Sequence, residues 1–329
     1  MVFHCKRTFS MKSICILGAG RGGITLAELL KKEEGSLDIT VIDKKSYFFD
    51  KNYFFPLLFN KEKEKVINLN EFFSNVGINF INKEVERVSF SKKNLYFKDK
   101  STMGFKNLIV CTGLISQELS IKGEHREGFF YMSEIDPLSF RNYIKIASDF
   151  VIFASTILGV RLAFCLSFFN KEIKLISNSL DFLGRKKEEV ISILKRRNID
   201  IYENAEITEV IGNSIVKATK ISLPKVFSSN VVVVDTHLLP NLKILETSLK
   251  EGELPPQVML LGDVARKNIE KEYFFIFNSI NVYREAKALA EKITERGEGY
   301  FFPKVYTLQD IESFLDEEFN EKKVLSWIS

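Results

Sequence analysis

The sequence predicts an α/β protein with two similar lobes, each built around a sheet of parallel strands. Two stretches indicate this, residues 13–43 and 150–176, because each reads as a short apolar run, a turn, a helix-period segment and a second apolar run. The length of 329 residues agrees, since at about 100–200 residues per domain the chain has room for two or three domains. We therefore expect one strand–helix–strand unit to open each lobe.

The composition is that of a folded globular protein, with 45% apolar and 27% charged residues. It excludes a collagen-like or wholly disordered chain. The formal net charge is only +4 and the basic residues are scattered, so we expect no nucleic-acid partner. The cysteines have no CxxC spacing and the histidines no HExxH or HxH spacing, which predicts a reducing cytoplasm, no disulfide framework and no metal.

Residues 1–115 are expected to form the first part of the first lobe. After the opening unit, the aromatic segment Tyr47–Leu58, which contains Pro56, interrupts the pattern as an excursion. Helical and alternating patterns then follow along the chain. They predict a helix at Leu69–Phe73, a strand at Ile78–Ile81, an antiparallel ribbon of Val85–Phe90 with Asn94–Phe97, and a buried strand at Leu108–Val110.

Residues 116–245 are expected to form the second lobe, inserted in the first. Its predicted elements are a strand and helix within Phe150–Phe169, a strand at Ile173–Ile176, a helix over residues 186–197, a strand at Ile199–Tyr202, a pair of alternating strands near Ile207–Val216 and a buried strand at Val231–Val234. Residues 246–300 contain a strand at Val258–Leu261 and a helix over residues 279–296, which would close back onto the first lobe. Residues 301–329 form a C-terminal helical tail.

A glycine motif opens the first lobe. Gly18, Gly20 and Gly23 form G-x-G-x-x-G directly after the first strand and at the start of a helix, and Asp43 ends the next strand. Gly18 permits the tight turn, Gly20 lets the backbone approach a pyrophosphate, and Gly23 lets helix and strand pack closely. Asp43 has the spacing of an acid that accepts a hydrogen bond from an adenosine ribose hydroxyl. The motif and its context predict a bound dinucleotide.

The sequence resembles the two-dinucleotide-binding-domain flavoproteins, the pyridine nucleotide-disulfide oxidoreductase superfamily. Three further segments carry the resemblance by their order: Cys111-Thr112-Gly113, Leu239-Pro240-Asn241 and Leu261-Gly262-Asp263. It implies two Rossmann-like, three-layer ββα-type dinucleotide-binding domains, the second inserted in the first, with FAD as cofactor. The cofactor-binding residues that it implies are Gly18, Gly20, Gly23, Asp43, Val85, Thr112, Gly113, Gly262 and Asp263. No catalytic side chain is named, because a flavin can take a hydride when positioning alone does much of the work.

Within that superfamily, the segment Tyr53–Leu58 is similar to the F-x-P-L-L segment of type II NADH dehydrogenases and of the related sulfide:quinone oxidoreductases. An aromatic, apolar segment beside a flavin could line a quinone pocket or shield the flavin from water. Ordinary core aromatics explain it equally well in a chain that holds 30 Phe. Both interpretations stay open.

The second glycine motif departs from the superfamily pattern. Where G-x-G-x-x-G is expected, the chain has Ala154 and Thr156 in place of the first two glycines and keeps Gly159. The β-branched Thr156 stands where a pyrophosphate must approach the backbone. Only Thr156 and Gly159 mark a nicotinamide-site turn, and NAD(P)H binding in the usual mode is not predicted.

The residues around this turn leave the electron donor open. The acid expected on the NADH ribose is replaced by Ser177 or Asn178, and an NADPH preference would explain that loss if Arg161 or Arg185 met the 2′-phosphate. An NADPH preference would not explain why Thr156 replaces the second glycine of the motif. Sulfide:quinone oxidoreductases need no NADH, but their chemistry needs a cysteine pair, and here Cys111 and Cys165 lack evident partners.

The tail from Leu308 to Ile328 repeats apolar residues at helical spacing among acidic ones. An acidic face is wrong for an anionic membrane, so we expect the tail to dock on the body or on the partner of a homodimer. Trp327 leaves open a peripheral contact at the inner face of a membrane.

Together with these patterns, the resemblance implies an FAD-dependent oxidoreductase, similar to type II NADH dehydrogenase, that passes electrons from a small-molecule donor through FAD to a quinone or similar acceptor. Two alternatives stay open. One is a flavoprotein with a non-nicotinamide donor such as sulfide, and the other is a flavoprotein-derived binding subunit without turnover.

Overall fold

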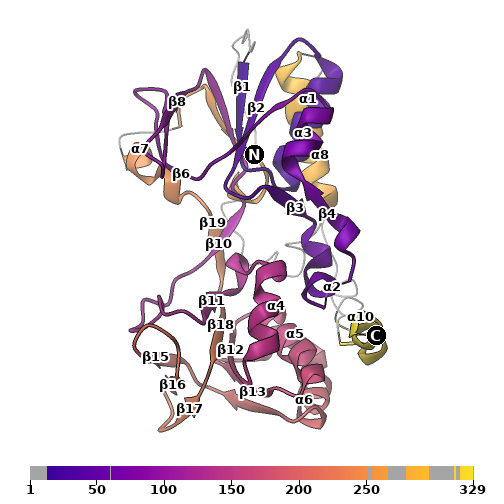
Figure 1. Ribbon diagram of the computed structural model, residues 1–329, viewed down its shortest axis with the longest axis vertical. Helices are drawn as coiled ribbons and strands as arrows, with labels where there is room; N and C mark the ends of the chain where they lie inside the picture. Colours follow the sequence, from indigo (N-terminus) through magenta and orange to yellow (C-terminus); the bar gives the residue numbers. More distant parts are fainter. Residues whose placement is uncertain are drawn as a thin grey trace.

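The chain forms two α/β lobes joined by a narrow connection, as the computed structural model shows (Figure 1). It describes residues 13–59, 61–250, 254–265, 279–295, 315 and 319–328. Each lobe contains one parallel five-stranded sheet with helices on one face and a small antiparallel sheet on the other. The predicted fold class, two Rossmann-like lobes with one inserted in the other, is confirmed.

The sheet of the first lobe has the strand order β20-β9-β1-β2-β5, and all its pairs are parallel. These strands are β20 (Val258–Leu260), β9 (Asn107–Val110), β1 (Ser13–Leu17), β2 (Asp38–Asp43) and β5 (Asn79–Asn82). Because β20 pairs with β9, the chain returns to this sheet after completing the second lobe.

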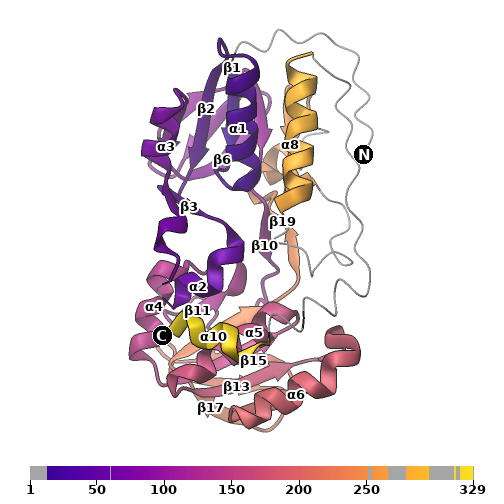
Figure 2. The ribbon, with the colours of Figure 1, turned by 90° about the vertical axis from the view of Figure 1, so that its right-hand side faces the viewer.

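Alternate side chains of the first sheet enter two different apolar clusters, which gives the lobe three layers. Ile14 and Ile16 of β1 pack beneath α1 (Arg21–Glu33), α3 (Leu69–Asn75) and α8 (Ser279–Ile293). Cys15 and Leu17 pack against β6 (Val85–Ser89) and β7 (Asn94–Phe97), which form a small sheet with β8 (Thr102–Gly104). Figure 2 shows α8 lying beside α1.

The second lobe repeats this arrangement with the strand order β11-β18-β12-β13-β14, again all parallel. Its strands are β11 (Phe129–Tyr131), β18 (Val231–Asp235), β12 (Asp149–Ala154), β13 (Glu172–Ser177) and β14 (Ile199–Glu203). One face is covered by α4 (Pro137–Ile146), α5 (Ile157–Leu166) and α6 (Lys187–Arg196). The other is covered by β15 (Ile207–Ile211), β16 (Ala218–Ile221) and β17 (Val226–Ser228).

Two structures link the lobes. The antiparallel pair of β10 (Leu114–Ser116) and β19 (Leu238–Pro240) carries the chain out of the first lobe and back (Figure 1). A hairpin of β3 (Tyr47–Phe49) and β4 (Val66–Asn68) projects α2 (Phe54–Leu58) from the first lobe, and the side chains of α2 enter the core of the second. The predicted excursion is therefore an element that the two lobes share.

The described part of the tail docks on the body of the same chain. Val324 of α10 (Glu321–Ile328) is fully buried, and Leu315 and Phe319 are buried in the same cluster. Figure 2 shows α10 lying across α2 and α5. The rest of the predicted tail pattern, from Leu308 onward, lies outside the described residues. No helix among those described has the length and apolar character needed to cross a membrane.

One pair of strands extends further along the chain than its predicted position. We expected two alternating strands near residues 207–216, and the structure has β15, which ends at Ile211, and β16, which begins at Ala218. Gly212 turns the chain with a positive φ, and the Lys217 N–H donates to the Ile211 carbonyl. The apolar residues Ile215 and Val216 therefore lie in the connection, which the alternation alone does not distinguish from a strand.

Candidate functional site

The glycine turn of the first lobe has the backbone conformation that its motif requires. Gly18 has a φ of +108°, and a Cβ there would lie 2.5 Å from the Cys111 carbonyl oxygen. A Cβ at Gly23 would lie 1.9 Å from the Gly18 carbonyl oxygen, so helix and strand could not pack so closely. Gly20, the N-cap of α1, is different, because among the described residues no atom outside its own chain neighbours and the helix backbone lies within 4 Å of a Cβ built there. In the part of the chain that the structure describes, the start of α1 is thus open beside Gly20.

Asp43 is fixed beside this turn by two backbone hydrogen bonds. Its Oδ2 accepts from the Ala19 N–H at 2.7 Å, and its Oδ1 accepts from the Lys45 N–H at 2.8 Å. A carboxylate oxygen has a second lone pair, so each can still accept a hydrogen bond from a ligand hydroxyl. The structure brings the acid and the glycine turn together as the spacing of the motif predicts.

Two of the segments matched by order alone meet in space. The Thr112 hydroxyl donates to the Asn241 carbonyl at 2.7 Å, and the Asn241 N–H donates to the Gly113 carbonyl at 2.9 Å. Gly113 has a φ of +67°, and no atom of the other described residues, its chain neighbours apart, lies within 4 Å of a Cβ built there. Thr112 and Gly113 thus form the crossover between the lobes, and the Thr112 hydroxyl is engaged within the protein.

Gly262 and Asp263 follow β20 at the same edge of the first sheet, because the carboxyl ends of β1, β9 and β20 are adjacent. Gly262 has a φ of +79°, and its N–H donates to the Glu285 carboxylate at 3.0 Å. Glu285 lies on α8, and the sequence alone does not indicate its role, because no local pattern relates it to Gly262. Val85 has only 8% of its surface exposed and packs in the core, so a contact with a cofactor would fall to its backbone.

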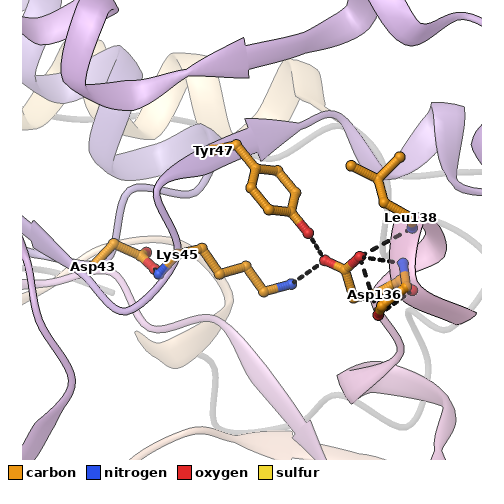
Figure 3. Close-up of polar contacts among 6 residues, drawn as sticks. Asp43, Lys45, Tyr47, Asp136 and Leu138 are labelled. Carbon is orange, nitrogen blue, oxygen red and sulfur yellow. Dashed lines mark hydrogen bonds and ion pairs between the residues drawn. The ribbon is translucent and has the colours of Figure 1, made fainter.

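A polar cluster joins the lobes near this edge (Figure 3). The Tyr47 hydroxyl donates to the Asp136 carboxylate, and the Lys45 ammonium lies 3.6 Å from it. The other carboxylate oxygen of Asp136 caps α4 by accepting from the N–H groups of Leu138 and Ser139. The contact ties the acid-bearing strand end of the first lobe to the second lobe.

The corresponding turn of the second lobe is occupied by a carboxylate. Oδ2 of Asp235, at the end of β18, accepts hydrogen bonds from the Thr156 N–H at 3.1 Å, the Thr156 hydroxyl at 2.8 Å and the Gly159 N–H at 2.8 Å. Asp235 is only 2% exposed. Burial raises the pKa of Asp235 to about 6, while these hydrogen bonds oppose the increase. Asp235 was missed because it reads as the ordinary polar end of a buried strand.

Arg161 does not serve this turn. Its guanidinium carbon lies 4.0 Å from the ring centroid of Phe55 in α2 and 5.6 Å from that of Trp327 in α10. Burial lowers the pKa of Arg161 to about 10, so it stays charged at neutral pH. Arg185 is exposed. The suggestion that Arg161 meets a 2′-phosphate is wrong, because the side chain links α5 to α2 and the tail.

The described cysteines are poorly suited to thiol chemistry. Cys15, Cys111 and Cys165 are free thiols. Burial raises the pKa of Cys15 and of Cys165 to about 12, and burial raises that of Cys111 as well. A buried thiol with a raised pKa is protonated at neutral pH and is a weak nucleophile.

The fold and its two turns define a class, that of proteins with two Rossmann-like dinucleotide-binding lobes, one inserted in the other. Residues 12–272 match the pyridine nucleotide-disulphide oxidoreductase family. The chain belongs to this family of flavoprotein oxidoreductases.

Individual relatives are distant. Human apoptosis-inducing factor 3 is 23% identical over 249 residues, which cover 73% of this chain and 41% of that protein. The chain thus spans about two fifths of the length of this relative. A ferredoxin reductase from Rhodopseudomonas palustris has a TM-score of 0.70 at 15% identity, over 86% of this chain and 76% of the other. The sulfide:quinone oxidoreductase of Aquifex aeolicus has a TM-score of 0.65 at 16% identity, with the same coverage. These structural likenesses establish the fold.

Proposed function

We propose that this protein is an FAD-dependent oxidoreductase that binds FAD in the first lobe and passes electrons from a reduced donor to a quinone or similar acceptor. The observation that carries the proposal is the open glycine turn at Gly20. It stands at the N-terminus of the 13-residue helix α1, where free N–H groups and the helix dipole favour a pyrophosphate. When bound, FAD would supply the electron-accepting and electron-donating chemistry.

The residues around the turn have separate roles in this proposal. Gly20 lets a phosphate approach the backbone, and Asp43 accepts from the adenosine ribose. Gly262 and Asp263, at the adjacent strand end, would meet the ribitol. Asp263 is partly exposed, as a residue that contacts a ligand should be. Glu285 holds the Gly262 N–H and thereby positions this segment.

The burial of the aromatic segment Phe54–Leu58 supports core packing better than the lining of a quinone pocket. All five of its side chains are buried, and Phe54, Phe55 and Leu58 belong to the core of the second lobe. A residue buried in this way cannot line an open pocket. We propose that a quinone or similar acceptor approaches the flavin from another side.

Reconstitution with FAD tests the assignment of the site. A Gly20→Val variant should keep the fold, because Gly20 has φ −76° and ψ −174°, a conformation that any residue adopts, and no other described segment has an atom within 4 Å of its added Cβ. The valine would project toward the bound phosphate, so we expect FAD affinity to fall at least about tenfold. Gly35→Ala is the matched control, since the contact found for its added Cβ among the described residues is the Lys31 carbonyl oxygen, at 3.9 Å. Unchanged FAD binding by Gly20→Val would refute the assignment.

A half-reaction tests the acceptor without knowledge of the donor. The FAD-loaded protein is reduced anaerobically with dithionite, and a soluble quinone is then added. We expect reoxidation of bound flavin faster than that of free reduced FAD at the same concentration. Reoxidation no faster than for free FAD would contradict the quinone proposal and favour a binding subunit without turnover.

A further inference from the structure

The two glycine turns of the molecule differ in what faces the start of the helix. At α1 no described segment covers the turn beside Gly20, and the nearby acid, Asp43, accepts hydrogen bonds from the backbone N–H groups of Ala19 and Lys45. At α5 a carboxylate oxygen of Asp235 bonds directly to the N–H groups of Thr156 and Gly159. These groups belong to the N-cap and the first turn of α5, the donors that a dinucleotide pyrophosphate uses in a lobe of this kind.

We infer that Asp235 stands in for the pyrophosphate of a nicotinamide dinucleotide and closes the second lobe to NAD(P)H. The inference rests on the proposed function, because it concerns which donor can feed the flavin. An incoming pyrophosphate would have to displace Asp235 from three hydrogen bonds and lie beside its negative charge. Hydrogen bonds to charged groups are among the stronger ones in proteins, and like charges repel.

The backbone holds Asp235 firmly in this position. Ala154 at the end of β12 is directly opposite Asp235 in the parallel register, and the Ser155 N–H donates to the Asp235 carbonyl at 2.8 Å. The Cβ atoms of Ala154 and Asp235 would each lie 2.9 Å from a Cβ added at Gly159. The surviving glycine of the motif therefore makes room for the aspartate.

The side chain of Thr156 also opposes the binding of a pyrophosphate at this turn. Thr156 is the N-cap of α5, and its hydroxyl accepts from the Leu158 N–H at 3.2 Å while it donates to Asp235. The Thr156 hydroxyl and the N–H groups of Thr156, Leu158 and Gly159 thus all have hydrogen-bond partners within the protein. The group expected from the family does not fit here, and a donor must reach the flavin without docking on this turn.

Calorimetric titration of the FAD-loaded protein with NADH at pH 7.5 tests the inference. We expect no saturable binding by the wild type up to about 1 mM, the weak end of the affinity scale. The double variant Asp235→Ala/Thr156→Gly removes the carboxylate and the β-branched side chain and leaves the N–H groups of α5 without their acceptor. We expect it to bind NADH at least about tenfold more tightly than the wild-type limit.

Asp136→Ala is the matched control, because Asp136 caps α4, another ten-residue helix, which begins without a glycine turn. We expect no gain of NADH binding in this variant. Saturable NADH binding by the wild type would overturn the inference. This outcome is independent of whether the variants fold. A double variant that retains its near-UV circular dichroism and still fails to bind NADH would overturn it as well. Flavin absorbance recorded before the titration separates the two proposals. Protein without flavin would contradict FAD binding in the first lobe, while the NADH titration still tests whether the turn of the second lobe binds NADH.

Discussion

The hydroxyl of Tyr47 donates a hydrogen bond to the carboxylate of Asp136 and so joins β3 of the first lobe to α4, the first α-helix of the second lobe. Both side chains are partly buried. The same carboxylate caps α4 and faces the Lys45 ammonium. A single acid therefore fixes the start of a helix and the approach of the two lobes.

Tyr47→Phe should destabilise the folded protein by about 1–2 kcal/mol, because it removes a hydrogen bond to a charged group and leaves the packing of the ring. Urea unfolding followed by far-UV circular dichroism measures the change. A double-mutant cycle with Asp136→Asn separates this contact from the helix cap, since the asparagine oxygen can still cap α4. A coupling free energy near zero would show that the contact contributes nothing.

Trp327→Ala should destabilise the docked tail and the core beneath it. The indole stacks on Phe59 with ring centroids 6.0 Å apart and lies over the guanidinium of Arg161. Loss of these contacts should cost about 2 kcal/mol. Leu325 on the same helix is 50% exposed, so Leu325→Ala is the control and should change the free energy of unfolding by less than about 0.5 kcal/mol. Equal effects of the two substitutions would mean that Trp327 is not docked as described.

Asp235 should make stability depend on pH in the opposite sense to most carboxylates. Its pKa is raised by burial to about 6 in the folded protein and is near 3.8 when unfolded, so the folded state binds more protons between these values. Its contribution to stability is therefore fully present below about pH 4 and is lost as the pH rises through about 6.

Asp235→Asn removes this titration. Relative to the variant, the wild type should lose on the order of 3 kcal/mol between pH 4 and pH 7.5. Urea unfolding of both proteins across this range measures the difference between their free energies of unfolding. A difference that stays constant with pH would contradict the raised pKa of Asp235.

Much of the fold follows from local pattern. The glycine turns, the apolar strands and the alternating ribbons are short-range signals, and the structure places β1, β9, β12 and β18 where the apolar runs predict them. The first-lobe turn also follows, because Gly18, Gly20 and Gly23 have positions set by one strand and one helix.

What the sequence does not reveal depends on register and on contacts between distant segments. Asp235 is 76 positions from Gly159, and only the parallel pairing of β12 with β18 brings the two together. One signal could have identified Asp235: an acid directly after a buried apolar run, in a lobe whose glycine motif has lost two of its three glycines. Likewise, nothing local predicts that Arg161 packs on Phe55, because that contact needs the excursion of the first lobe to enter the second.

An anaerobic visible spectrum of the FAD-reconstituted protein, recorded before and after excess NADH and then after dithionite, decides whether the first turn is open and the second closed. We expect bound flavin that NADH leaves oxidised and dithionite reduces. Reduction by NADH faster than that of free FAD would contradict the closed second turn, and the absence of bound flavin after reconstitution would contradict the open first turn.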